Sequence, residues 1–314
     1  MAAPAPTPHH ARGAGQRASV LYALGANIAV AVAKGVAGLL GGSAAMIAEA
    51  AHSVADTADQ GLLLISLRRG ELPADGRHQV GYGRERFFWA LLAAIFIFIG
   101  GAVFSIAEGV ATLTVLPEEP ERFRLAVAVL GLSLVAESVS FRRALREVGE
   151  GARRHRTSVR RYLRHSTDPT VRTVVFEDGA AIAGVLVALG AVTLHHLTGD
   201  AWWDAAGAIA VGLLLAVAAI ALARDTKALL IGEAALPEEQ RRLREVLTRQ
   251  PEIAAVRSLV TTHIGPARLL VAARVTLAGD AGPAEIAALG PRVRESMRRE
   301  VPDVTEVYLD PTAP

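Results

Sequence analysis

One stretch of the sequence places four ionisable side chains at helical spacing. The segment 48–60 contains four of them, spaced three, four and three positions apart: Glu49, His52, Asp56 and Asp59. We call these four residues the polar stripe. Residues three or four apart share one face of an α-helix, so all four side chains would point the same way. An imidazole and a carboxylate at i and i+4 can bind one divalent cation, with zinc–ligand distances of about 2 Å.

The polar stripe falls within residues 43–67, a segment otherwise rich in apolar residues. A helix of about 20 mostly apolar residues spans a bilayer, and this segment is long enough. A charged group at membrane depth costs about 2.5 to 3.5 kcal/mol on insertion scales, so function is the default interpretation of four such groups. The alternative is a buried ion pair that only braces the helix bundle.

A second acidic pair, Glu177 and Asp178, lies in the apolar segment 170–197. Adjacent residues on a helix point about 100° apart, so only one of the two is expected to face the polar stripe. The alternative is a carboxylate bonded to a serine or arginine of a neighbouring helix. Lys34, in the first apolar segment, is a candidate to neutralise one acid of the stripe when no metal is bound.

The composition of the whole chain is that of a membrane protein. Of its 314 residues 52% are hydrophobic and 20% charged, and the mean hydropathy is +0.34, which is too apolar for an ordinary soluble protein of this length. We expect an all-α six-helix transmembrane bundle in a lipid bilayer. The six segments are residues 19–40, 43–67, 86–112, 123–145, 170–197 and 202–223.

Arginine is unevenly distributed between these segments. The second and fourth connections are rich in it, with Arg68, Arg69 and Arg84 in one and Arg153 and Arg154 in the other. Positive residues beside spans mark the cytoplasmic side. Six spans then put both termini in the cytoplasm, and the expected location is a bacterial inner (plasma) membrane.

From residue 237 the composition becomes that of a soluble domain. Leu269, Val271, Ala273 and Val275 recur every second position, which is typical of a strand. The order helix, strand, strand, helix, strand fits a small cytoplasmic α+β domain of ferredoxin-like type. The expected domains are a disordered tail (1–18), a six-span transmembrane domain (19–230) and the ferredoxin-like domain (231–314).

The chain contains no cysteine, so a metal ion would be bound by His, Asp, Glu or backbone oxygen. Such ligands suit several divalent ions, and the sequence leaves zinc, iron, manganese, cobalt and cadmium open. Histidine beside carboxylates also titrates in the physiological range, so metal binding should expel protons.

Two motifs resemble those of the cation diffusion facilitator family. They are Gly-Ser-Ala-Ala-Met-Ile-Ala-Glu-Ala-Ala-His-Ser-Val-Ala-Asp, which starts at Gly42, and Gly-Tyr-Gly-Arg-Glu-Arg, which starts at Gly81. The second motif, together with Glu177-Asp178, is similar to the divergent branch that contains zinc transporter nine. The resemblance covers essentially the whole chain. It implies a homodimeric transporter that exports zinc or related divalent ions in exchange for protons by alternating access.

The resemblance also implies a set of metal ligands. The family's metal site maps onto His52, Asp56 and Asp178, whereas its fourth position falls on Val174, which cannot bind metal. Three ligands plus Glu177 or water is the arrangement we expect. Further candidates are Glu49 and Asp59 in the polar stripe, His78 in the connection where relatives carry a loop site, and His263, with Asp310, as a weak regulatory site.

The function we expect is efflux of a divalent cation, with zinc first, and neither an enzymatic reaction nor a cofactor. The alternative is a non-transporting membrane scaffold whose cytoplasmic domain binds partner proteins. The arginines of the fourth connection would also suit a nucleic-acid binder, but membrane topology and anionic lipid explain them equally well, and we expect no nucleic acid as a partner.

Overall fold

The computed structural model describes residues 25, 27–114, 123–154, 158–159, 169–278 and 282–312. The chain forms two compact units. The first comprises residues up to 64 together with 92–150 and 173–223, and the second comprises residues 65–91, 151–172 and 224–314. The prediction made for the tail 1–18 lies outside the described residues.

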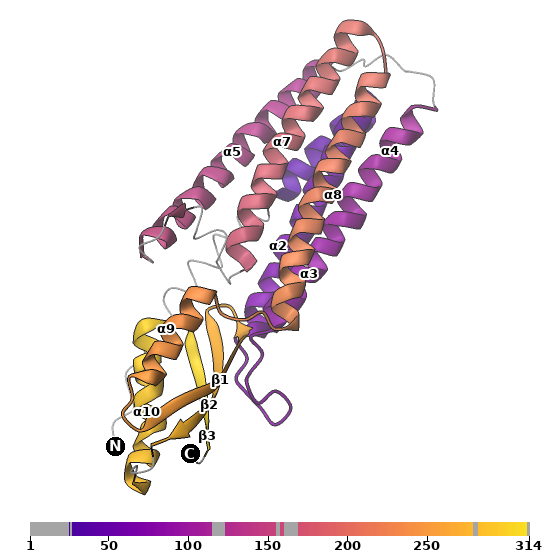
Figure 1. Cartoon of the computed structure of the whole chain (residues 1–314). Helices are drawn as coiled ribbons and strands as arrows, with labels where there is room; N and C mark the ends of the chain where they lie inside the picture. Colours follow the sequence, from indigo (N-terminus) through magenta and orange to yellow (C-terminus); the bar gives the residue numbers. More distant parts are fainter. Residues whose placement is uncertain are drawn as a thin grey trace, which may run out of the picture. The chain divides into compact units, whose positions relative to one another are not determined.

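The first unit is built from long helices that run alongside one another (Figure 1). Four helical stretches are long and apolar enough to cross a membrane: Glu85–Thr112, Phe123–Arg153, Val175–Thr198 and Trp202–Ile231. The last three lie in α5 (Phe123–Arg154), α7 (Pro169–Thr198) and α8 (Trp202–Ile231). Four of the six predicted spans are therefore matched by helices of the expected length and composition.

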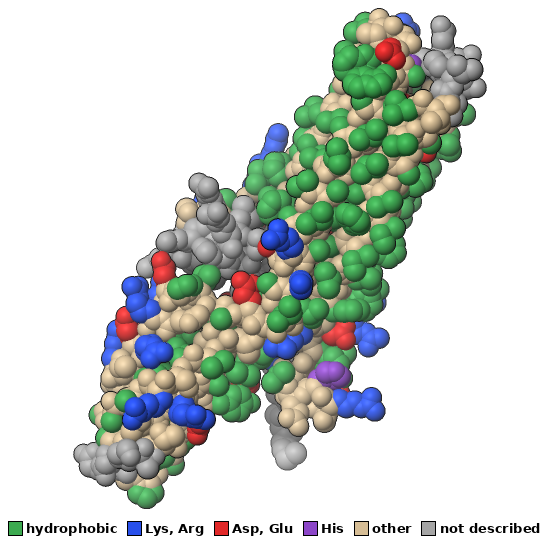
Figure 2. Space-filling model, turned by 45° about the vertical axis from the view of Figure 1, so that its right-hand side comes forward, with side chains coloured by type: hydrophobic (Ala, Val, Ile, Leu, Met, Phe, Trp, Pro, Cys, Tyr) green, Lys and Arg blue, Asp and Glu red, His purple; other side chains and the backbone are tan. Residues whose placement is uncertain are grey.

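The remaining two predicted spans also coincide with helices. α2 (Ala44–Gly70) has 27 residues, which exceeds the length of a span, and it carries the polar stripe. The helix Asn27–Gly41 is apolar but shorter within the described residues. Many large apolar side chains on these helices stay exposed, among them Leu132 at 67% and Val217 at 70%. Figure 2 shows such hydrophobic side chains covering the visible face of the helical unit, as expected of a surface in contact with lipid.

The third predicted span is not a uniform α-helix. It runs as α3 (Glu85–Phe96), a π-helical stretch η1 (Ile97–Val103) and α4 (Phe104–Thr112). Glycine allows this span to lie very close to α8. A Cβ atom at Gly109 would come 2.8 Å from the Ala205 carbonyl oxygen, and one at Gly212 would come 2.9 Å from the Ala102 carbonyl oxygen. Only glycine fits at such close approaches of two helix backbones.

The second unit contains the predicted α+β region. Its elements are α9 (Pro237–Thr248), β1 (Ile253–Gly265), β2 (Arg268–Leu277), α10 (Pro283–Glu300) and β3 (Val304–Thr312), in the predicted order. The three-stranded sheet has the order β1-β2-β3, with β1 antiparallel and β3 parallel to β2.

One face of this sheet carries the core of the second unit. The alternating residues of β2 that face it are fully or almost fully buried, from Leu269 to Val275. They pack in one cluster with Leu243 and Leu247 of α9 and Met297 of α10. Both helices therefore cover the same face of the sheet (Figure 1), because the period-two pattern leaves only one strongly apolar face.

The Gly81-Tyr-Gly-Arg motif packs against the β1–β2 hairpin within the second unit. A Cβ atom at Gly83 would lie 2.5 Å from the Ile264 carbonyl oxygen. The Arg268 guanidinium donates a hydrogen bond to the Val80 carbonyl at 3.2 Å. The glycine is therefore required by the close contact between this connection and the end of β1.

Candidate functional site

All four side chains of the polar stripe are buried in the helical unit, as their helical spacing predicted. The exposed fractions are 0% for Glu49, 1% for His52, 7% for Asp56 and 5% for Asp59. His52 Nδ1 lies 3.3 Å from Asp56 Oδ1. The i, i+4 spacing thus brings an imidazole nitrogen and a carboxylate oxygen together in the interior of the unit.

Glu177 of α7 lies across from this part of α2. It lines a small cavity together with His52, Ile97 and Leu215. Its carboxyl group also lies close enough to those of Asp56 and Asp59 for their charges to interact. Two helices of the unit, α2 and α7, therefore bring one imidazole and three carboxyl groups into one neighbourhood.

Asp178, the next residue of α7, has a different environment. Its Oδ2 accepts a hydrogen bond of 2.9 Å from the Ser140 hydroxyl of α5. The two acids point in different directions, as adjacent residues on a helix must. The Asp178 carboxylate is therefore bonded to a serine of a neighbouring helix, which was the alternative considered for this acidic pair. Glu177 is the acid that lies beside His52. The side chain of Val174 lies outside the described residues.

Several polar atoms of this neighbourhood have no hydrogen-bond partner among the described residues: His52 Nδ1 and Nε2, Asp56 Oδ1 and Glu177 Oε1. Buried polar atoms are normally paired, because leaving them unpaired costs free energy. A cation bound between the imidazole and the carboxylates would satisfy them. This donor set of nitrogen and oxygen atoms fits zinc and other first-row divalent ions.

The site is not closed around an ion in this conformation. No three His, Asp or Glu residues in the described part of the chain form a ready metal-binding group. Binding of a cation by His52, Asp56 and Glu177 therefore requires these side chains to draw together.

Glu49, the first residue of the polar stripe, is engaged by a buried lysine. Lys34 Nζ lies 3.0 Å from Glu49 Oε2 and 2.9 Å from Ser53 Oγ. From the sequence, Lys34 was a candidate to neutralise one acid of the polar stripe. In the structure, the acid that Lys34 contacts is Glu49.

Glu137 of α5 belongs to the same neighbourhood, although it is not among the site residues predicted from the sequence. It lies close enough to Asp56, Glu49 and Asp178 for their charges to interact. The signal was present, since an acid in the middle of an apolar segment is unusual. Its partners could not be identified without the packing of α5 against α2.

The two other histidine candidates, His78 and His263, belong to the second unit. His78 is about half exposed, and its Nδ1 lies 3.6 Å from Asp75 Oδ1. Asp75 also accepts hydrogen bonds from the Tyr82 hydroxyl and the His78 backbone N–H, which lower its pKa to about 2. Asp75 thus links His78 and Tyr82 within the connection before α3.

His263 is buried in β1, and its Nδ1 has no partner among the described residues. Burial lowers the pKa of His263, and the nearby Asp303 opposes that shift. The predicted partner Asp310 is elsewhere in the sheet. It is paired with Arg274 at 2.7 Å, whereas His263 lies opposite Leu269, five residues away along β2.

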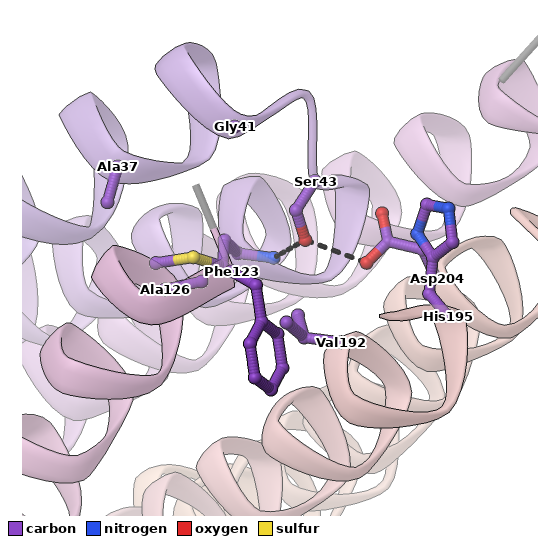
Figure 3. Close-up of a pocket in the computed structure, with 9 residues that line it drawn as sticks. Ala37, Gly41, Ser43, Phe123, Ala126, Val192, His195 and Asp204 are labelled. Atoms are coloured by element: carbon purple, nitrogen blue, oxygen red, sulfur yellow. Dashed lines mark hydrogen bonds between the residues drawn. The ribbon is translucent and has the colours of Figure 1, made fainter. Parts of the chain in front are cut away.

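A second buried polar cluster lies where α2 begins (Figure 3). Asp204 of α8 accepts a hydrogen bond of 2.7 Å from the Ser43 hydroxyl and another from the Ala44 backbone N–H. The imidazole of His195 lines the same small cavity. Ser43 Oγ in turn accepts a hydrogen bond of 3.2 Å from the Met46 N–H, so the first turn of α2 is capped from two sides.

The family follows from a comparison with known protein domains. Residues 20–231, about two thirds of the chain, match the cation efflux transmembrane domain. The chain belongs to the cation efflux family. The resemblance to cation diffusion facilitators, based on the motifs at Gly42 and Gly81, is thereby confirmed.

Individual relatives support the branch within this family. The chain is 34% identical over 239 residues to the human protein named proton-coupled zinc antiporter SLC30A9, mitochondrial, covering 76% of this chain and 42% of that protein. It is 33% identical over 234 residues to metal tolerance protein C4 of Arabidopsis thaliana, covering 74% of this chain and 51% of the relative. The chain thus spans about half the length of these relatives.

Proposed function

We propose that the chain is an efflux transporter for divalent metal cations, with zinc as the transported ion and protons as the counter-ion. The observation that carries this proposal is the group of His52, Asp56 and Glu177, in which four buried polar atoms have no hydrogen-bond partner among the described residues. Membership of the cation efflux family supports it, as does the human relative whose name describes a proton-coupled zinc antiporter.

In the proposed mechanism, a cation entering the helical unit is bound by the imidazole of His52 and the carboxylates of Asp56 and Glu177. Asp59 and Asp178 are further acids that the sequence analysis assigned to the site, and Asp178 is bonded to Ser140 in this structure. These ligands bind metal only when deprotonated, so loading expels protons. A change in the packing of the helices then exposes the site to the other side, where protons displace the ion.

The finer architecture belongs to the same proposal. We infer six transmembrane spans, a ferredoxin-like C-terminal domain and a homodimer in the membrane. The inferred domain boundaries are those of the sequence analysis, with the transmembrane domain at 19–230 and the ferredoxin-like domain at 231–314. Both termini would lie in the cytoplasm of a bacterium whose inner membrane holds the protein, because arginine-rich connections mark that side.

Metal flux into proteoliposomes with an imposed proton gradient tests the proposal. We expect zinc flux that requires the gradient and is lost in Asp56→Asn. The matched control is Thr193→Val in α7, because the Thr193 hydroxyl bonds only to the Leu189 carbonyl of its own helix among the contacts described. Absence of flux for zinc, manganese, cobalt and iron in the wild type would favour the scaffold alternative instead.

A further inference from the structure

The contact between Lys34 and Glu49 is the most deeply buried ion pair among the described residues. Both side chains have a solvent-exposed fraction of 0%. The Lys34 ammonium group uses two of its three N–H donors, one on Glu49 and one on Ser53. The lysine thus connects the helix Asn27–Gly41 to α2 within one turn of His52.

The surrounding helices leave room for Glu49 in this position. A Cβ atom at Gly184 of α7 would overlap Glu49 Oε1, so a larger residue there would require the carboxylate to shift. The second oxygen, Oε1, has no hydrogen-bond partner among the described residues. Glu49 therefore has one oxygen bonded to Lys34 and one still able to accept a ligand.

Glu49 is three residues from His52 on the same helix face, which is a suitable spacing for a further metal ligand. In the structure its negative charge is instead matched by the lysine. The charge of Lys34 also acts on His52 and Asp56. Any cation that used Glu49 as a ligand would have to displace the ammonium group.

We propose that Lys34 is a specificity-determining residue of the transport site, a tethered cation that withholds the Glu49 carboxylate from the transported metal. The inference rests on the proposed function, because it concerns the same site. With Glu49 occupied, the metal is bound by one imidazole nitrogen and a limited number of carboxylate oxygens. This set favours zinc over cations that prefer several oxygen ligands, such as manganese.

The test compares metal affinities of purified full-length protein in detergent, measured by titration calorimetry with zinc and with manganese at one pH. In Lys34→Met the Glu49 carboxylate is released. We expect manganese to bind at least about tenfold more tightly than to the wild type, since changes next to metal ligands alter affinity by about 10- to 100-fold. The affinity for zinc should increase by a smaller factor, so the ratio of zinc affinity to manganese affinity should be lower in Lys34→Met than in the wild type.

The double variant Lys34→Met/Glu49→Gln removes both charges and is the decisive control. We expect its two affinities to return to the wild-type values. If the single variant does not fold because Glu49 is left unpaired, the double variant still tests the inference. A metal affinity well below that of the wild type would mean that Glu49 is itself a ligand, and would overturn the inference.

Failure of the inference can be told apart from failure of the proposed function. Zinc binding by the wild type that is lost in Asp56→Asn, together with equal affinities in the wild type and Lys34→Met, would overturn the role of Lys34 and leave the transport site intact. Wild-type protein that binds neither metal would overturn both.

Discussion

Asp204 of α8 accepts a 2.7 Å hydrogen bond from Ser43, the residue that precedes α2 (Figure 3). The same carboxylate accepts a hydrogen bond from the Ala44 backbone N–H. It thus caps the N-terminus of a helix other than its own, where negative charge interacts favourably with the helix dipole. Because α2 carries His52 and Asp56, this contact fixes the start of the helix that holds both side chains to α8.

Removal of this cap should destabilise the helical unit. In Asp204→Ala the Ser43 hydroxyl and the Ala44 N–H lose a buried acceptor, and we expect a loss of about 1 to 3 kcal/mol. Thermal unfolding in detergent measures the effect. Asp204→Asn keeps one acceptor oxygen and should lose less. An Asp204→Ala protein as stable as the wild type would show that the contact contributes nothing to stability.

The connection before α3 offers a test with a matched pair of glycines. In Gly83→Ala the new methyl group would lie 2.5 Å from the Ile264 carbonyl oxygen, so the connection must move away from β1. We expect a loss of about 1 to 3 kcal/mol, typical of overpacking. Gly76→Ala, in the same connection, has nothing within 4 Å and should be neutral.

Unfolding midpoints of the two glycine variants check this contact. Limited proteolysis offers a second readout, because a displaced connection should be cut faster in Gly83→Ala than in Gly76→Ala. Equal midpoints and equal cleavage rates in the two variants would contradict the close packing of Gly83 against β1.

His263 predicts a pH dependence of stability. Burial lowers its pKa in the folded protein, so the folded state favours the neutral imidazole. This contribution to stability is fully present above the unfolded pKa of about 6.5 and is lost as the pH falls toward the folded value. The unfolding midpoint of the wild type should therefore fall more between about pH 7.5 and pH 5.5 than that of His263→Gln. Parallel pH profiles in the two proteins would rule out this role for His263.

The sequence predicted features that depend on local pattern. The alternation from Leu269 to Val275 identified β2, and the spacing from Glu49 to Asp59 identified one buried face of α2, because both patterns repeat the geometry of a single element. Apolar length located the helices for the same reason. The π-helical stretch η1 was missed, since nothing in its sequence separates it from an ordinary span.

Features that depend on how helices are rotated against one another could not be read from the sequence. The partner of Lys34 could have been any acid of the polar stripe, and the interaction between Asp204 and Ser43 joins residues 161 positions apart. The separation of His263 from Asp310 follows from the register of the three strands. That register could not be derived from this single sequence.

The choice between Glu177 and Asp178 is the sharpest case, and it gives the last prediction. The family resemblance assigns Asp178 as a metal ligand, whereas the structure has Glu177 beside His52 and Asp178 bonded to Ser140. We expect Glu177→Gln to weaken zinc binding by at least about 100-fold, because a direct ligand matters more than an outer partner, whose loss costs about 10- to 100-fold.

Asp178→Asn is the matched variant, one residue away on the same helix. Its side chain can still accept the hydrogen bond from the Ser140 hydroxyl, so the packing of α7 against α5 is retained. We expect zinc affinity within about tenfold of the wild type, the lower end of the effect of an outer partner. Calorimetric titration of both variants decides the matter. The reverse ranking would mean that α7 rotates when metal binds, bringing Asp178 toward His52 in place of Glu177.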